Sequence, residues 1–139
     1  MSINLVQIRE MIEKIEEELI NIRRDIHMNP ELGFEEYRTS QLIADRLEAL
    51  GLEVKRNVAK TGVVATLNGN SEGPIIGLRA DMDALSMEDE KEVSYRSKVA
   101  GKVHACGHDA HTTILLGTAM VLSQFKGELP GQIGFIFQP

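Results

Sequence analysis

The sequence predicts an α/β fold in which helices pack in layers against a mixed β-sheet. Helical patterns alternate along the chain with short runs of apolar, β-branched residues, which is the order that builds layered α/β domains. The 139 residues amount to one domain, with 42% hydrophobic residues, 26% charged residues, 12 Gly and 4 Pro. This is the composition of an ordinary globular protein and excludes a disordered or collagen-like chain.

Three helices are predicted from the spacing of apolar residues. The first covers residues 5–26, where apolar side chains recur at intervals of three and four, and it stops before Pro30. The second covers residues 35–50 and ends at Gly51, which suits a left-handed C-terminal stop. Apolar residues within 114–125 mark the third.

Four extended segments complete the predicted layers. Residues 54–58 and 63–67 have the composition of strands, and the apolar run 75–80 follows a turn rich in Gly and Asn. We therefore expect residues 63–80 to form a hairpin. Residues 132–137 give the final strand.

Charge and hydropathy narrow the possible partners. The 15 Lys and Arg against 21 Asp and Glu leave a net charge of −6, without the basic cluster that nucleic-acid binding requires. No apolar stretch reaches the length of a membrane span, and the N-terminus lacks the pattern of a signal peptide. We therefore expect a cytoplasmic protein with no nucleic-acid or membrane partner.

Two acidic residues stand at a chemically suggestive position. Asp81 and Asp83 follow the apolar run 75–80 directly, and open α/β sheets place their ligands beyond the carboxyl ends of strands. The two carboxylates are therefore candidates for metal or substrate work. A solvated turn or an aspartate helix cap would account for them equally well.

The segment 104–111 concentrates the remaining chemistry. It holds the only cysteine and three of the four histidines: His104, Cys106, His108 and His111. Thiolate sulfur and imidazole nitrogen are good ligands for zinc-like ions, and Gly107 frees the backbone so that Cys106 and His108 can turn toward one point. Asp109 would serve as a helix cap or as an acceptor for a ligand imidazole.

Each of these residues also has a simpler explanation. A lone Cys106 could be a small buried side chain, or a nucleophile activated by His104 or His108. His111 could cap, hydrogen-bond or pack within the third helix. His27, in the last turn of the first helix, is explained as a cation favoured by the helix dipole, and we assign it no chemistry.

Together these segments resemble a known enzyme family. Residues 79–85 read Arg-Ala-Asp-Met-Asp-Ala-Leu, and residues 104–109 read His-Ala-Cys-Gly-His-Asp. This pair is similar to the metal-dependent amidohydrolases of the M20 peptidase family, nearest to the branch of N-acyl-amino-acid amidohydrolases, hippurate hydrolases and auxin-conjugate hydrolases. Upstream residues fit the same pattern: Arg24, His27, Pro30, Glu31 and Glu35.

The resemblance implies a site with two divalent metal ions, which could be zinc, manganese or cobalt. Cys106 and His108 would be metal ligands, with the sulfur bridging the ions. Asp81 would be the catalytic-site carboxylate that orients a ligand histidine from outside the coordination sphere. Arg79 stands where other branches carry a metal-binding histidine.

The implied reaction is hydrolysis of the amide bond of an N-acyl amino acid or a peptide-like small molecule, in an enzyme that is a homo-oligomer at full length. Two other functions stay open on the residues alone. One is a hydrolase with Cys106 as nucleophile, and the other is a non-catalytic interaction module.

The chain departs from the family pattern in two ways. Ser86 replaces the proline that usually follows Asp-Ala-Leu. The family continues beyond Phe-Gln-Pro with a glutamate pair, further histidine ligands and a dimerisation domain. Residues 1–139 are therefore expected to be the N-terminal portion of the zinc-peptidase-like catalytic domain, incomplete in this chain, which would bind metal weakly and lack turnover. Its strand 132–137 is expected to expose an apolar edge.

Overall fold

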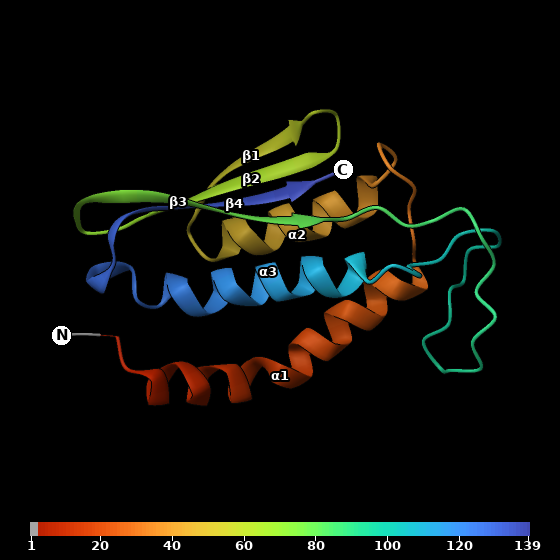
Figure 1. Cartoon of the computed structure of the whole chain (residues 1–139), viewed down its shortest axis with the longest axis horizontal. Coiled ribbons are helices and arrows are strands. Elements are labelled where there is room, and N and C mark those ends of the chain that lie inside the picture. Colours follow the sequence, from red (N-terminus) through yellow and green to blue (C-terminus); the bar gives the residue numbers. More distant parts are fainter. Residues whose placement is uncertain (1–2) are drawn as a thin grey trace.

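A mixed sheet of four strands forms one layer of the protein in a computed structural model that describes residues 3–139 (Figure 1). In chain order the helices and strands are α1 (Leu5–Met28), α2 (Tyr37–Ala49), β1 (Glu53–Val58), β2 (Gly62–Asn68), β3 (Ser71–Asp81), α3 (His108–Ser123), the short 3₁₀ helix η1 (Lys126–Glu128) and β4 (Pro130–Gln138). The predicted α/β class with a mixed sheet is confirmed.

The sheet order is β1-β2-β4-β3. β2 pairs antiparallel with both β1 and β4, whereas β3 pairs parallel with β4. The expected hairpin over residues 63–80 is therefore wrong, because β4 lies between β2 and β3. The expectation for strand 132–137 is also wrong, since β4 is an inner strand and the outer strands are β1 and β3.

All three helices lie on the same side of the sheet. α2 packs against β1 and β2, α3 packs against β3 and β4, and α1 lies along α3 on the side away from the sheet (Figure 1). Alternating residues of β4 point into this layer, so that Ile133, Phe135 and Phe137 are buried. The core therefore sits between the sheet and the pair α2 and α3.

The helix ends differ from the predicted ends where the first turn is polar. α3 begins at His108, well before the apolar residues that marked it, because residues 108–113 are polar or small and carry no helical hydrophobic stripe. Gly107 precedes the helix with a left-handed φ of 100°, which glycine adopts without strain. Gly107 is the N-cap, so the suggested capping role of Asp109 is wrong.

A long irregular segment, residues 86–107, joins β3 to α3. Its only ladder contact is the bridge between Leu85 and Val103 at its base. The segment passes the C-terminal end of α1, where the Lys98 amide donates to the Met28 carbonyl over 2.9 Å. Within residues 3–139, no helix combines the length and apolarity that a membrane crossing would require.

Candidate metal centre

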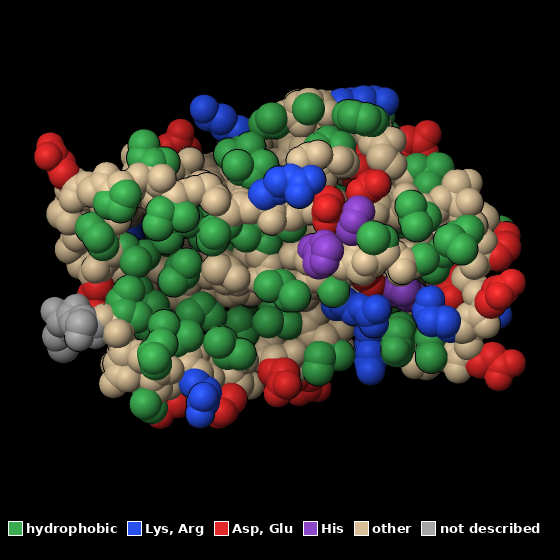
Figure 2. All heavy atoms as spheres, viewed as in Figure 1, with side chains coloured by type: hydrophobic (Ala, Val, Ile, Leu, Met, Phe, Trp, Pro, Cys, Tyr) green, Lys and Arg blue, Asp and Glu red, His purple; other side chains and the backbone are tan. Residues whose placement is uncertain are grey.

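The candidate site lies where β3 ends and α3 begins. Asp81 is the last residue of β3, and His108 is the first of α3. The Thr112 hydroxyl donates to the Asp81 carbonyl over 2.7 Å and holds the helix start against the strand end. Figure 2 shows imidazole and carboxylate side chains gathered on the surface near this junction. The site thus occupies the edge of the sheet at which α/β proteins bind ligands.

One carboxylate and two imidazoles converge here. Asp81, His108 and His111 each offer one ligand atom, and the three atoms lie within 4.8 Å of one another. An Asp81 oxygen is 2.9 Å from Nδ1 of His111, and its other oxygen is 3.5 Å from Nε2 of His108. The two histidines are neighbours because residues three apart share a helix face. Such a donor set suits a zinc-like divalent ion.

Asp83 holds the other side of the His108 ring. Its carboxylate lies 2.8 Å from Nδ1 of His108, and its backbone carbonyl lies 3.1 Å from the same nitrogen. A proton on Nδ1 would leave Nε2 free, with its lone pair toward Asp81. A carboxylate on the far nitrogen is the arrangement that fixes a ligand imidazole. Asp83 thus has the geometry that the sequence argument gave to Asp81.

Cys106 lies two residues before His108, and its side chain is exposed. Its sulfur is not one of the three converging ligand atoms. Its role as a ligand therefore stays a prediction, as do the roles of His108 and Asp81. Arg79 projects from β3 beside the cluster, with its guanidinium 3.8 Å from an Asp81 oxygen.

The electrostatic environment keeps Asp81 ionised. Burial would raise the pKa of this carboxyl, but the hydrogen bond from His111 and the nearby His108 together hold the pKa below its usual value. An ionised carboxylate is the form that binds a cation.

Comparison with known proteins shows similarity to one family. Residues 77–139, which include both motifs, match the family described as Peptidase family M20/M25/M40. The crystal structure of the Bacillus subtilis YXEP protein, described as a dinuclear metal binding peptidase from the M20 family, superposes with a TM-score of 0.87 at 45% sequence identity. The match covers 91% of this chain and 36% of that one. The chain is therefore similar to the M20 family over both motifs.

Curated relatives agree with this assignment. An IAA-amino acid hydrolase (ILR1-like 4) of Arabidopsis thaliana is 52% identical over 87% of this chain and 27% of its own length. The N-acetylcysteine deacetylase of Bacillus subtilis is 48% identical over 87% of this chain and 32% of its own length. The chain spans about a third of the length of the curated relatives it matches.

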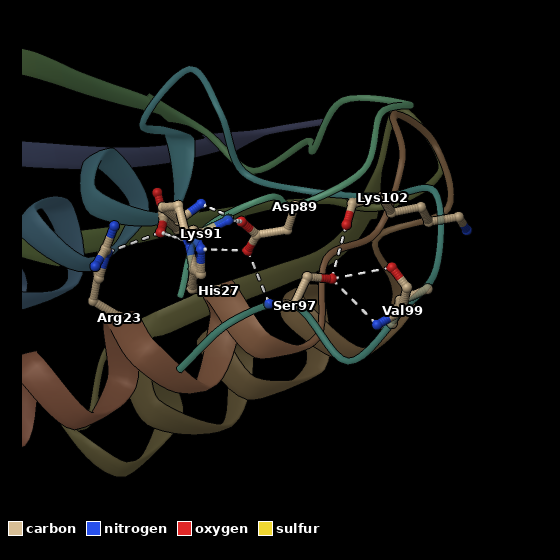
Figure 3. Close-up of polar contacts among 8 residues, drawn as sticks. Arg23, His27, Asp89, Lys91, Ser97, Val99 and Lys102 are labelled. Atoms are coloured by element: carbon tan, nitrogen blue, oxygen red, sulfur yellow. Dashed lines mark hydrogen bonds and ion pairs between the residues drawn. The ribbon is translucent and has the colours of Figure 1, made fainter. Parts of the chain in front are cut away.

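A second polar cluster, which the sequence analysis missed, adjoins the candidate site at the first turn of α3. His27 is 1% exposed, with Nδ1 2.7 Å from an Asp109 oxygen and Nε2 3.3 Å from an Asp89 oxygen (Figure 3). Arg23 approaches the same Asp109 oxygen to 2.9 Å. The interpretation of His27 as a helix-dipole cation is therefore insufficient. No local pattern reveals the cluster, because its members lie far apart in the sequence.

His104 is buried next to that cluster. Neither ring nitrogen has a hydrogen-bond partner among the described residues, and the His27 and His104 ring centroids are 6.5 Å apart. Burial lowers the pKa of His104 to about 4, so the ring is neutral at physiological pH. His104 is not one of the residues whose ligand atoms converge at the candidate site.

The buried side chain of Glu36 predicts how the stability of the protein depends on pH. Its side chain is buried, one oxygen accepts from the Thr61 hydroxyl over 2.6 Å, and the other has no partner among the described residues. Burial raises the pKa of Glu36 above 4.5. As pH rises above 4.5, Glu36 loses its proton in the unfolded state before it does so in the folded state. The free energy of unfolding therefore falls as pH rises toward the pKa that Glu36 has in the folded state.

Glu36→Gln is expected to abolish this decrease, because glutamine does not ionise. The stability of the variant relative to the wild type should therefore be greater at pH 8 than at pH 4. Urea unfolding in EDTA at both pH values measures the difference. Glu35→Gln is the matched control, since the neighbouring Glu35 side chain is exposed. An equal response of both variants to pH would refute the assignment.

Proposed function

We propose that this chain contributes part of a two-metal centre to an amidohydrolase that cleaves the amide bond of N-acyl amino acids. The observation that carries the proposal is the convergence of Asp81, His108 and His111 at the end of β3, with Cys106 on the adjoining segment. The names of two relatives, an IAA-amino acid hydrolase and an N-acetylcysteine deacetylase, support an amide between an acyl group and an amino acid. We propose residues 1–139 as the N-terminal portion of the catalytic domain.

The side chains of the proposed site have different roles. Cys106 and His108 would hold the ions, and His111 faces the same point. Asp83 orients His108 through Nδ1, and the ionised Asp81 supplies negative charge beside both rings. When bound, divalent ions lower the pKa of a shared water and polarise the amide carbonyl. Zinc, manganese and cobalt all suit this mixed donor set.

The thiol-hydrolase alternative requires an imidazole in contact with Cys106. Across residues 3–139 no hydrogen bond joins the Cys106 thiol to a histidine. The imidazoles of His108 and His111 are instead turned toward aspartates. The geometry therefore favours metal binding over a cysteine nucleophile.

Cobalt binding tests the proposal directly. The 139-residue chain is expected to bind Co²⁺ with a near-ultraviolet charge-transfer band from the Cys106 thiolate, and Cys106→Ser is expected to lose that band. Met87→Ala is the matched control, because Met87 is an exposed sulfur-bearing side chain in the same irregular segment. A band that survives Cys106→Ser would exclude the thiolate as a ligand.

Hydrolysis is tested in a protein of the relatives' full length that contains this chain. N-acetyl and N-benzoyl amino acids are expected to be cleaved, with activity lost in EDTA and restored by added metal. Activity that resists EDTA but is lost in Cys106→Ser would support the cysteine nucleophile instead.

A further inference from the structure

We infer that His27 is a positioning residue for the metal centre, because it ties the segment that bears the ligands to α1. This inference rests on the proposed function above. It concerns three residues to which the comparisons assign no role: His27, Asp89 and Asp109.

The ligand-bearing segment needs such a tie. Cys106 lies in residues 86–107 and His108 follows them directly. As described, this segment contains no helix, and its backbone is tied to the rest of the fold by the bridge between Leu85 and Val103 and by the hydrogen bond from Lys98 to Met28. A segment without regular backbone hydrogen bonds is held by side-chain contacts. Metal ligands must be held to within about 0.5 Å of their working geometry. The contacts that fix this segment therefore bear directly on the centre.

His27 joins three parts of the chain at one buried ring. It belongs to the last turn of α1, Asp89 lies on the outgoing leg of the irregular segment, and Asp109 lies in the first turn of α3 (Figure 3). Because ionised carboxylates only accept hydrogen bonds, the ring bridges both aspartates when both of its nitrogens carry hydrogen.

Both aspartates have further partners in this arrangement, and of their carboxylate oxygens only Oδ1 of Asp109 is buried without a partner among the described residues. Asp89 accepts from the Lys91 ammonium at 2.7 Å and from the Ser97 amide at 2.9 Å. Burial would raise the pKa of Asp89, but these hydrogen bonds lower it well below the usual range. The Arg23 guanidinium forms an ion pair with Asp109 at 2.9 Å. The charges of the cluster are therefore matched by partners from α1 and from the irregular segment.

The contact between His27 and Asp109 lies one peptide unit from the candidate metal ligand His108. Asp109 follows His108 directly, so an anchored Asp109 side chain fixes the helix turn from which His108 projects. Tyr95 covers the other side of the cluster, with its ring 5.7 Å from that of His27 and under the Arg24 guanidinium at 4.7 Å. His27, Asp89 and Asp109 are all buried at this point, and burial strengthens the interactions among them.

Stability alone does not explain this cluster. Burying charges costs desolvation energy, and well-packed apolar side chains often stabilise a core as well as an ion pair does. Buried polar groups of this kind are retained in some proteins because they select one conformation. Here the conformation selected is that of the segment carrying Cys106 and His108.

The test measures Co²⁺ affinity and the visible Co²⁺ spectrum of the 139-residue chain. His27→Gln and Asp89→Asn are each expected to weaken cobalt binding about 10-fold, the effect typical of lost outer partners, and to alter the spectrum. Leu47→Ala is the control for plain destabilisation, because Leu47 is fully buried on α2, which packs against β1 and β2. It is expected to lower stability and leave affinity and spectrum unchanged.

Two results would overturn the inference. One is unchanged cobalt affinity and spectrum in both His27→Gln and Asp89→Asn, and the other is an equal change in Leu47→Ala. Circular dichroism at the binding temperature confirms that each variant is folded.

Amide hydrogen exchange in EDTA separates this inference from the proposed function. His27→Gln is expected to speed exchange in residues 104–111 at least about 10-fold while leaving β2 and β4 unchanged. If the wild type binds no cobalt, the proposed metal centre fails, and faster exchange confined to residues 104–111 still supports the tie. Exchange that is unchanged in those residues overturns it.

Discussion

Replacing His108 by Ala is expected to lower the affinity of the chain for Co²⁺ by more than about 100-fold, which is the upper end of what losing an outer partner costs. His108 is central to the candidate site, because its Nε2 lies 3.5 Å from Asp81 and its Nδ1 lies 2.8 Å from Asp83. The variant removes a donor and leaves two carboxylates without the imidazole between them. Isothermal titration with Co²⁺ measures the change.

Ile114→Ala is the control for this variant. Ile114 lies on the same helix and is 64% exposed, so its loss is expected to leave cobalt binding unchanged. Retained wild-type affinity in His108→Ala would remove His108 from the centre and contradict the proposed function.

Phe135→Ala is expected to lower the free energy of unfolding by about 3–5 kcal/mol. Phe135 is fully buried in the inner strand β4, where it pairs in register with Ala65 of β2 and Leu78 of β3. Truncation leaves a cavity between the sheet and the helices, and close-packed interiors relax only partly around such a space. Urea unfolding followed by circular dichroism measures the loss.

Ile136→Ala offers a matched comparison from the next residue of the same strand. Ile136 is 38% exposed, so its truncation is expected to cost less than half as much. Phe135→Leu keeps the measurement possible if Phe135→Ala leaves too little folded protein. Equal losses at Phe135 and Ile136 would contradict the placement of the core on the helix side of the sheet.

The sequence was sufficient for features that depend on neighbouring residues. The long helix α1 follows from a repeat of apolar residues, and β1 and β2 follow from short β-branched runs. Strand order was not predictable in this way, because paired residues such as Ala65 and Phe135 are separated by about half of the chain. The apparent turn before β3 suggested a local hairpin, whereas the partner of β3 lies beyond α3.

The same limit applies to the candidate site: residues close in sequence were predicted together, and contacts between distant residues were not. Cys106, His108 and His111 were visible because they crowd into one short segment, and Asp81 was visible because it ends a strand. The contact between Asp83 and the His108 ring was not, since Asp83 differs from Asp81 only in how the turn directs it. The burial of His27 was not predicted, because the apolar repeat of a helix does not show which residues a distant loop covers.

The inner position of β4 bears on how a nascent chain folds. β2 and β3 leave the ribosome long before β4, yet neither pairs with the other, so each presents an open backbone edge while α3 is still being made. Open strand edges recruit other chains, and long-range pairing closes them slowly. The nascent chain is therefore prone to aggregation until β4 inserts between β2 and β3. Binding of a chaperone should protect it most just before residue 130 emerges.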